Sequence, residues 1–110
     1  MTKATAIFSN GFTDTYKGTR PVKAAWAVIS TLDGEVLNSG HSLDRDKALK
    51  TAEGSLQCCG TRLIARDHPL RYIEGPNPHL SSARRRADRA HNAARLALIR
   101  SLTTIEVVDL

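Results

Sequence analysis

The strongest pattern in the chain is Val22–Thr31, where the residues on both faces of a predicted strand are apolar. Successive side chains along a strand point to opposite faces, so a strand that is apolar on both faces is typical of the centre of a sheet. Asp33-Gly34 follows, a dipeptide typical of a two-residue hairpin turn. Glu35–His41 is therefore predicted to return as an antiparallel partner strand.

Three weaker strands are predicted elsewhere. Ala4–Ser9 is a short apolar run that ends at Asn10-Gly11, a dipeptide that favours a turn. Leu70–Ile73 is a candidate short strand, and the alternating, β-branched segment Thr103–Leu110 predicts the last one. Between the first strand and the central one, the polar segment Phe12–Arg20 is predicted to be either a loop or an irregular strand.

Helical spacing of apolar residues begins after the hairpin. Asp44 or Asp46 can cap a helix that runs to about Cys59, and Gly60 is predicted to end it. The segment Gly75–Pro78 excludes regular structure and predicts a rigid turn. The buried stripe of this first helix is predicted to consist of Ala48, Leu49, Ala52 and Leu56.

A second helix is predicted near the end of the chain. Ser81 or Ser82 can cap it, and it runs to about Arg100. Small alanine side chains would let this helix approach a sheet closely. Its inner stripe is predicted to consist of Ala83, Ala87, Ala90, Ala94, Ala97 and Leu98.

The predicted order is three strands, a helix, a strand, a helix and a final strand, in a single domain over residues 1–110. Helices between strands predict crossover connections and hence a mixed sheet. We therefore predict an α+β fold in which two helices pack on one mixed sheet. A chain of 110 residues with 41% apolar residues suits one folded domain with a modest core.

This order of elements resembles the ribonuclease H-like fold, and some local segments do so too. Ile7–Gly11 is similar to the family's first strand, which runs into an Asp-Gly step, and Ala25–Val28 is similar to its aromatic-bearing second strand. Ser39-Gly40-His41 resembles the end of the third strand. Glu53 lies on the predicted helix that corresponds to the one carrying a catalytic glutamate in the family.

The resemblance implies a metal-dependent nuclease, in which clustered carboxylates hold two Mg²⁺ ions that activate water. The acids available for this role are Asp14, Glu53 and Glu74. The family's first-strand acid is replaced by Asn10, whose amide supplies no negative charge and would weaken a bridging metal position. We therefore expect a non-catalytic relative, and Mg²⁺ is an expected cofactor only under the nuclease hypothesis.

The net charge of the chain comes from one segment. The sequence holds 16 Lys and Arg against 11 Asp and Glu, a formal charge of +5. Six arginines and one acid, Asp88, lie in His79–Arg100, whereas the rest of the chain is balanced. Arginine binds phosphate through paired hydrogen bonds, so such a helix is typical of a surface for a polyanion, above all nucleic acid. The predicted contact residues are Arg84, Arg85, Arg86, Arg89 and Arg95, together with Lys17, Arg20 and Lys23.

The same charges are also compatible with two further roles. Charged helix faces are usually solvated surface, and an acidic protein partner would also fit the arginines. We predict a phosphate-directed nucleic-acid-binding module of low sequence specificity. The alternative is a protein-binding inhibitor or adaptor of the phage or mobile-element type that docks on an acidic surface, and the second alternative is the metal-dependent nuclease.

The remaining chemistry-bearing residues add little. Phe12 and Tyr16 are candidates for base stacking, and Trp26 is expected in the core. No apolar run approaches the length of a membrane span and no leader is evident, so a cytoplasmic location without membrane contact is expected. The candidate zinc ligands Cys58, Cys59, His68 and His79 match no usual zinc-site spacing, so no metal site is predicted.

Overall fold

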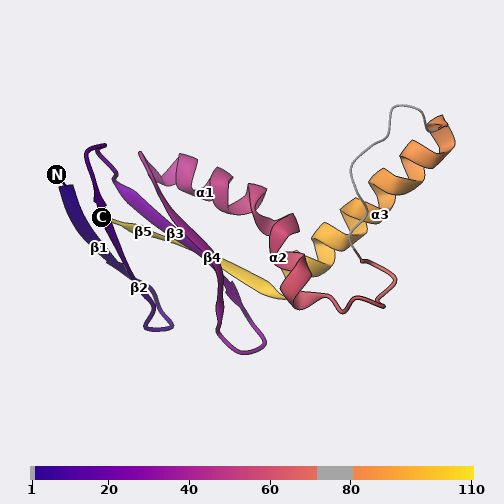
Figure 1. Ribbon diagram of the computed structural model, residues 1–110, viewed down its shortest axis with the longest axis horizontal. Helices are drawn as coiled ribbons and strands as arrows, with labels where there is room; N and C mark the ends of the chain where they lie inside the picture. The colour runs from indigo at the N-terminus through magenta and orange to yellow at the C-terminus, as the bar shows by residue number, and fades with distance from the viewer. Residues whose placement is uncertain (1, 72–80) are drawn as a thin grey trace.

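The computed structural model describes residues 2–71 and 81–110, which form five strands and three helices (Figure 1). The α+β class is confirmed. In chain order the elements are β1 (Thr2–Ile7), β2 (Thr13–Gly18), β3 (Ala24–Ser30), β4 (Val36–Ser42), α1 (Arg45–Gly54), α2 (Leu56–Leu63), α3 (Ser82–Ser101) and β5 (Thr103–Asp109).

The central sheet has the strand order β4-β3-β5. Every residue of β3 is buried, which confirms the prediction of a central strand. The β3–β4 hairpin is confirmed too, because Ala25 pairs with His41. The predicted two-residue turn is wrong, because residues 31–35 connect the two strands; Gly34 adopts a positive φ of 75° within this longer connection. On the other side of β3, Ala25 pairs with Val108 of β5.

The prediction of a mixed sheet is wrong for the described strands, because every pairing among them is antiparallel. β4 and β5 point in the same direction, but β3 lies between them, so the helical connection crosses over one strand without creating a parallel pair. The predicted strand Leu70–Ile73 is not seen at Leu70 and Arg71, which lie outside strands. Its last two residues, and the turn predicted at Gly75–Pro78, lie outside the described residues.

A separate hairpin of β1 and β2 covers one face of the central sheet. The polar segment Phe12–Arg20 therefore contains a regular strand, because exposed and half-buried residues alternate along β2. The core between the two sheets consists of Ala6, Phe8, Ala25, Ala27 and Ile29.

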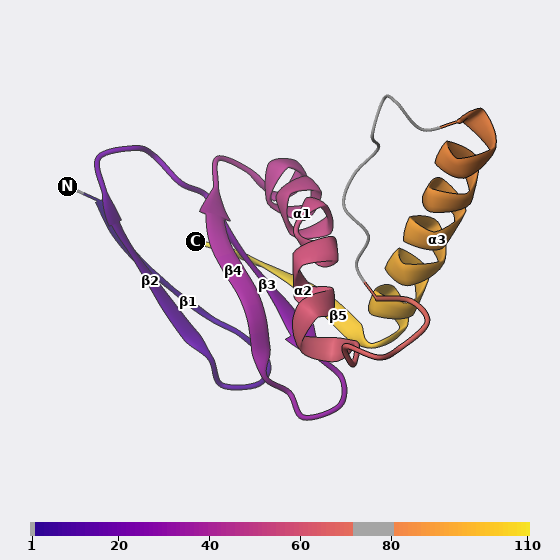
Figure 2. The ribbon, with the colours of Figure 1, turned by 45° about the vertical axis from the view of Figure 1, so that its right-hand side comes forward.

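Helix α1 covers the opposite face of the central sheet, so the body has three layers (Figure 2). Asp44 caps α1, with its Oδ1 accepting from Lys47 N at 2.8 Å. The core on this side consists of Ala24, Trp26, Val28, Ala48, Ala52, Leu56, Cys59, Ile64 and Ile99. The prediction of Leu49 in this stripe is wrong, because Leu49 lies on the outer side of α1 and is 44% exposed.

The first predicted helix is broken into α1 and α2 around Ser55. The predicted end at Gly60 is wrong, because α2 continues to Leu63. The glycine has a different role, because a Cβ added to it would lie 2.7 Å from both Arg95 Cζ and Ile99 Cδ1. Helix α3 therefore lies close against α2 at Gly60.

Helix α3 leaves the body of the protein. Figures 1 and 2 show its last turns beside α2 and the start of β5, and its first turns far from the sheet. The protein measures 51 × 30 × 18 Å, and its radius of gyration of 16.5 Å exceeds the about 13 Å expected of a compact domain of this length. We call residues 82–90 the outer half of α3 and residues 91–101 the inner half.

The predicted inner stripe of this helix is wrong. Its five alanines are all exposed, and Leu98 is only half-buried. The residues of α3 that are buried against the body are Arg95 and Ile99. The helix therefore turns a different face to the protein, and only at one end.

Candidate polyanion-binding surface

The outer half of α3 begins at a side-chain cap. Ser81 Oγ accepts a hydrogen bond from Arg84 N at 3.2 Å, as predicted for a serine at this position. The first turn contains no acid, although the positive end of a helix dipole favours one there. The arginines that follow thus oppose the local helix field.

Three of these arginines share one side of the helix. At about 100° per residue, Arg85, Arg86 and Arg89 fall within an arc of about 100°. Arg86 and Arg89 are exposed, and Arg85 is half-buried with its Nη2 donating to Ser82 Oγ at 3.3 Å. This strip of Arg85, Arg86 and Arg89 is the arginine strip. Arg100 is exposed on the same side, further along α3.

The local charge is only partly neutralised. Arg84 Nε lies 3.4 Å from Asp88 Oδ1, an ion pair between residues one helical turn apart. Among the residues that the structure describes, Arg86 and Arg89 have no ion pair. Four arginines and one aspartate leave a formal charge of +3 over residues 84–89.

Arg95 is not part of this surface, so its prediction as a contact residue is corrected. It is 1% exposed, and its Nη1 donates to the backbone oxygen of Gln57 at 2.9 Å and to Gln57 Oε1. Arg95 follows Arg86 by nine positions, which turns its side chain by about 180° around the helix. The sequence signal for the burial of Arg95 was Ile99, an apolar residue one turn further along the same face of the helix.

The other predicted basic residues lie at the far end of the molecule. Lys17 is exposed on β2, opposite Lys3 in the register of the β1–β2 hairpin. Arg20 and Lys23 are exposed just after it. Figure 1 shows this hairpin and the outer half of α3 at opposite ends of the long axis. The structure therefore does not join these residues to the arginine strip.

The acids implied by the nuclease hypothesis are not brought together. Asp14 lies between the two sheets, with its Oδ2 3.5 Å from His41 Nε2. Glu53 is exposed on α1, across the central sheet from Asp14. Glu74 lies outside the described residues. Within residues 2–71 and 81–110, no group of three His, Cys, Asp or Glu side chains could hold a metal ion.

Asn10 has a structural role in the turn between β1 and β2. Its Oδ1 accepts from Phe12 N at 3.0 Å, and its Nδ2 donates to the carbonyl of Gly34 at 2.9 Å. The side chain therefore shapes its own turn and ties it to the β3–β4 turn. An amide suits this position better than a carboxylate, because the second contact needs a donor.

The aromatic candidates pack inside the protein. Phe12 stacks on Phe8 with ring centroids 5.7 Å apart, and Tyr16 packs against His41 at 5.2 Å. Trp26 is 5% exposed, as expected of a core residue. Base stacking on Phe12 or Tyr16 would require these contacts to open.

The two adjacent cysteines face different environments. Cys58 is exposed and Cys59 is buried, which agrees with their places on a helix. Burial raises the pKa of the Cys59 thiol. His68 Nδ1 accepts from Leu70 N at 2.9 Å, and His79 lies outside the described residues. Cys59 therefore belongs to the core, and His68 shapes the turn after α2.

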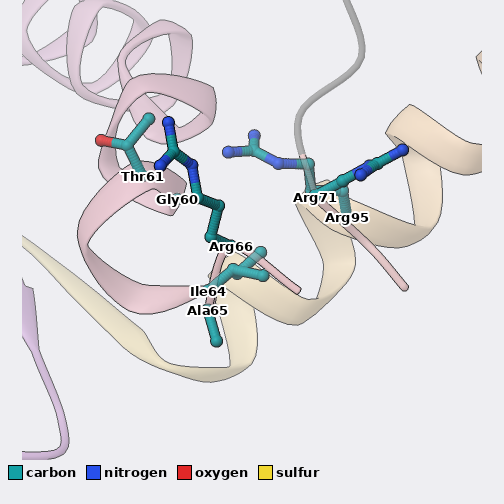
Figure 3. A pocket seen from close by; sticks show the side chains of 7 residues that line it. All are labelled: Gly60, Thr61, Ile64, Ala65, Arg66, Arg71 and Arg95. Carbon is teal, nitrogen blue, oxygen red and sulfur yellow. The ribbon is translucent and has the colours of Figure 1, made fainter. Parts of the chain in front are cut away.

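Sequence reasoning missed a pocket of about 690 Å³ between α2, the turn after it and α3 (Figure 3). Among the described residues that line it, the charged ones are Arg66, Arg71 and Arg95. These arginines are far apart in the sequence and follow no period, so no pattern along the chain joins them. The sequence therefore offered no signal for this pocket.

Comparison with known proteins gives no family for this chain. No family model, no curated protein and no solved structure matches it. The ribonuclease H-like resemblance therefore stays a prediction from the sequence. Separately, none of the described helices is long and apolar enough to cross a membrane.

Proposed function

We propose that this protein is a nucleic-acid-binding module whose contact surface is the outer half of α3. The single observation that carries this proposal is the arginine strip, which stands on a helix that projects from the body. Arginine binds phosphate oxygens through two parallel hydrogen bonds. A side chain that makes such contacts reads no sequence, so the expected specificity is low.

The shape of the outer half supports a duplex as the partner. An α-helix with its side chains is about 10–12 Å wide, and the major groove of DNA is about 12 Å wide. The exposed alanines Ala83, Ala87 and Ala90 keep the neighbouring face of the helix thin. Arginines on one side and alanines beside them allow the helix to lie in or along a groove with its charges toward phosphate.

Salt dependence of binding tests this proposal. Three phosphate contacts predict that log K falls with log salt with a slope of about −3, at about 0.9 per contact. Fluorescence anisotropy with a short labelled duplex measures the slope. The double substitution Arg86→Ala/Arg89→Ala is expected to reduce its magnitude by about 2.

The matched control is Lys3→Ala/Lys17→Ala, which removes the same charge from the opposite end of the molecule. It is expected to change the slope little. A slope that is flat in the unchanged protein, or that responds equally to both double substitutions, would contradict the proposal.

An acidic protein surface is the second candidate partner. The observation that favours it is the row of exposed alanines, because a helix face with small apolar side chains can lie in a protein groove. Capture of a single protein after nuclease treatment, lost on Arg86→Ala/Arg89→Ala, would support this candidate. The positions of Asp14 and Glu53 give no support to catalysis, and the absence of Mg²⁺-dependent cleavage of DNA, RNA and hybrid would dismiss it.

A further inference from the structure

The pocket between α2 and α3 has the composition of an anion site. Its described lining residues are Gly60, Thr61, Ile64, Ala65, Arg66, Arg71 and Arg95. Three of these seven described residues are arginines and none is an acid, so they carry a formal charge of +3. Figure 3 shows the three arginine side chains, from the turn after α2 and from α3, with one guanidinium group pointing away from the other two.

The three arginines contribute in different ways. Arg95 lies in the floor, where its hydrogen bonds to Gln57 fix the guanidinium. Arg66 and Arg71 are exposed at the rim and have no ion pair among the residues described. A charge held in a partly enclosed site acts on an anion more strongly than one in open water. Each rim arginine is therefore able to contribute a charge-assisted hydrogen bond to an anion in the pocket.

The turn that carries Arg71 is held in place. His91 Nε2 lies 2.6 Å from the backbone oxygen of Arg71, a hydrogen bond that ties the turn to α3. Within the turn, Leu70 N donates to His68 Nδ1 at 2.9 Å. Both contacts fix the backbone below the Arg71 side chain, which lowers the entropy lost when this side chain binds a ligand.

The size and the apolar wall indicate what accompanies the anion. About 690 Å³ exceeds what a lone phosphate fills and lies in the range of small-molecule sites. Ile64 and Ala65 supply an apolar wall beside the arginines. We infer that this pocket binds a phosphate monoester carried by an organic group of nucleotide size, at a site separate from the arginine strip.

Binding of mononucleotides tests the inference. Titration calorimetry with 5′-adenosine monophosphate is expected to detect binding at about 1 mM or below, with adenosine as the control that lacks the phosphate. Arg66→Ala and Arg71→Ala are each expected to weaken binding about tenfold, because each removes a charge-assisted hydrogen bond. Both residues are exposed, so these substitutions leave the fold intact.

The matched control is Arg62→Ala, an exposed arginine of α2 that pairs with Glu35 at 3.0 Å and does not line the pocket. It is expected to bind the mononucleotide as the unchanged protein does. Equal binding of adenosine and its monophosphate, equal binding by the Arg66→Ala/Arg71→Ala double variant, or no binding at all would overturn the inference.

The phosphate can come from a free nucleotide or from the end of a nucleic-acid strand. Oligonucleotides with a 5′-phosphate and with a 5′-hydroxyl distinguish these sources. Preference for the phosphorylated strand, lost in Arg66→Ala/Arg71→Ala, supports strand ends as the ligand. A free mononucleotide that binds as tightly as the phosphorylated strand supports a small ligand. Arg86→Ala/Arg89→Ala leaves the pocket unchanged and should therefore weaken duplex binding without changing mononucleotide binding. Failure of the duplex-binding proposal can thus be distinguished from failure of the mononucleotide site.

Discussion

Arg86 and Arg95 belong to the same helix and experience opposite surroundings. Arg86 is exposed on the outer half of α3, without an ion pair among the described residues, whereas Arg95 is 1% exposed and bonded to Gln57. The comparison shows that arginine has two different roles in this helix. In the inner half an arginine connects α3 to α2, and in the outer half arginines are available to a ligand.

The difference has an energetic side. A buried guanidinium has lost its water, so it stabilises the fold only because its surroundings replace those hydrogen bonds. An exposed guanidinium keeps its water and contributes little to the fold. Substitutions in the two halves should therefore separate stability from binding.

The largest effect is expected from Arg95→Ala. It leaves a cavity between α2 and α3 and removes the donor to the Gln57 carbonyl, so the free energy of unfolding should fall by about 3 kcal/mol. Urea denaturation measures the change. Arg86→Ala is the control and should stay within about 0.5 kcal/mol of the unchanged protein. Equal effects of the two substitutions would remove the distinction between the halves.

Gly60→Ala tests the same contact from the side of α2. The new methyl group would meet Arg95 Cζ and Ile99 Cδ1 at 2.7 Å, so the free energy of unfolding should fall by about 2 kcal/mol despite the better helix propensity of alanine. Gly54→Ala is the matched control, because nothing lies within 4 Å of its added Cβ. A gain in stability at both positions would show that α3 does not press on Gly60.

The reactivity of the two cysteines of α2 measures how tightly α2 packs against the inner half of α3. At pH 8, Ellman's reagent should modify Cys58 at least about tenfold faster than Cys59, because burial both shields the Cys59 thiol and raises its pKa. A raised pKa lowers the fraction of reactive thiolate at this pH. Arg95→Ala should accelerate the slow site, whereas Arg86→Ala should not. Equal rates in the unchanged protein would contradict the packing of α2 against α3.

The smallest and most specific effect concerns Arg85→Glu. It places an acid near the N-terminus of α3 and one turn before Arg89, so the free energy of unfolding should rise by about 0.5 kcal/mol. Duplex binding should weaken at the same time, because the arginine strip loses a positive charge and gains a negative one. Thermal denaturation and anisotropy measure the two opposite changes. A fall in both quantities would mean that Arg85 supports the fold.

The sequence predicted the elements that depend on local chemistry. The β3–β4 hairpin followed from Asp33-Gly34, although its connection is longer than the two residues predicted. The capping positions of α1 and α3 followed too, with Asp44 used rather than Asp46 and Ser81 rather than Ser82. Central burial of β3 followed from its two apolar faces. In each case the deciding interaction lies within a few residues of the signal.

Other features depend on what packs against an element. The alanines of α3 share a face, as their spacing predicts, but spacing alone does not say whether anything covers that face. Charge counting groups Arg95 with Arg86, although they point to opposite sides of the helix. Glycine often ends helices, which predicts a stop at Gly60, whereas here the residue makes room for α3.

The close approach at Gly60 also determines where α3 aims. Because α3 is held by the body only near its C-terminal end, a small shift there moves its N-terminal end much further. That N-terminal end, at Ser82, lies about 20 Å from Arg95, at 1.5 Å per residue. A shift of about 1 Å across the roughly 6 Å between Arg95 and Ile99 would swing that end by about 3 Å. Gly60, the smallest residue of α2, therefore affects the position of the guanidinium groups of the arginine strip, although it does not contact them.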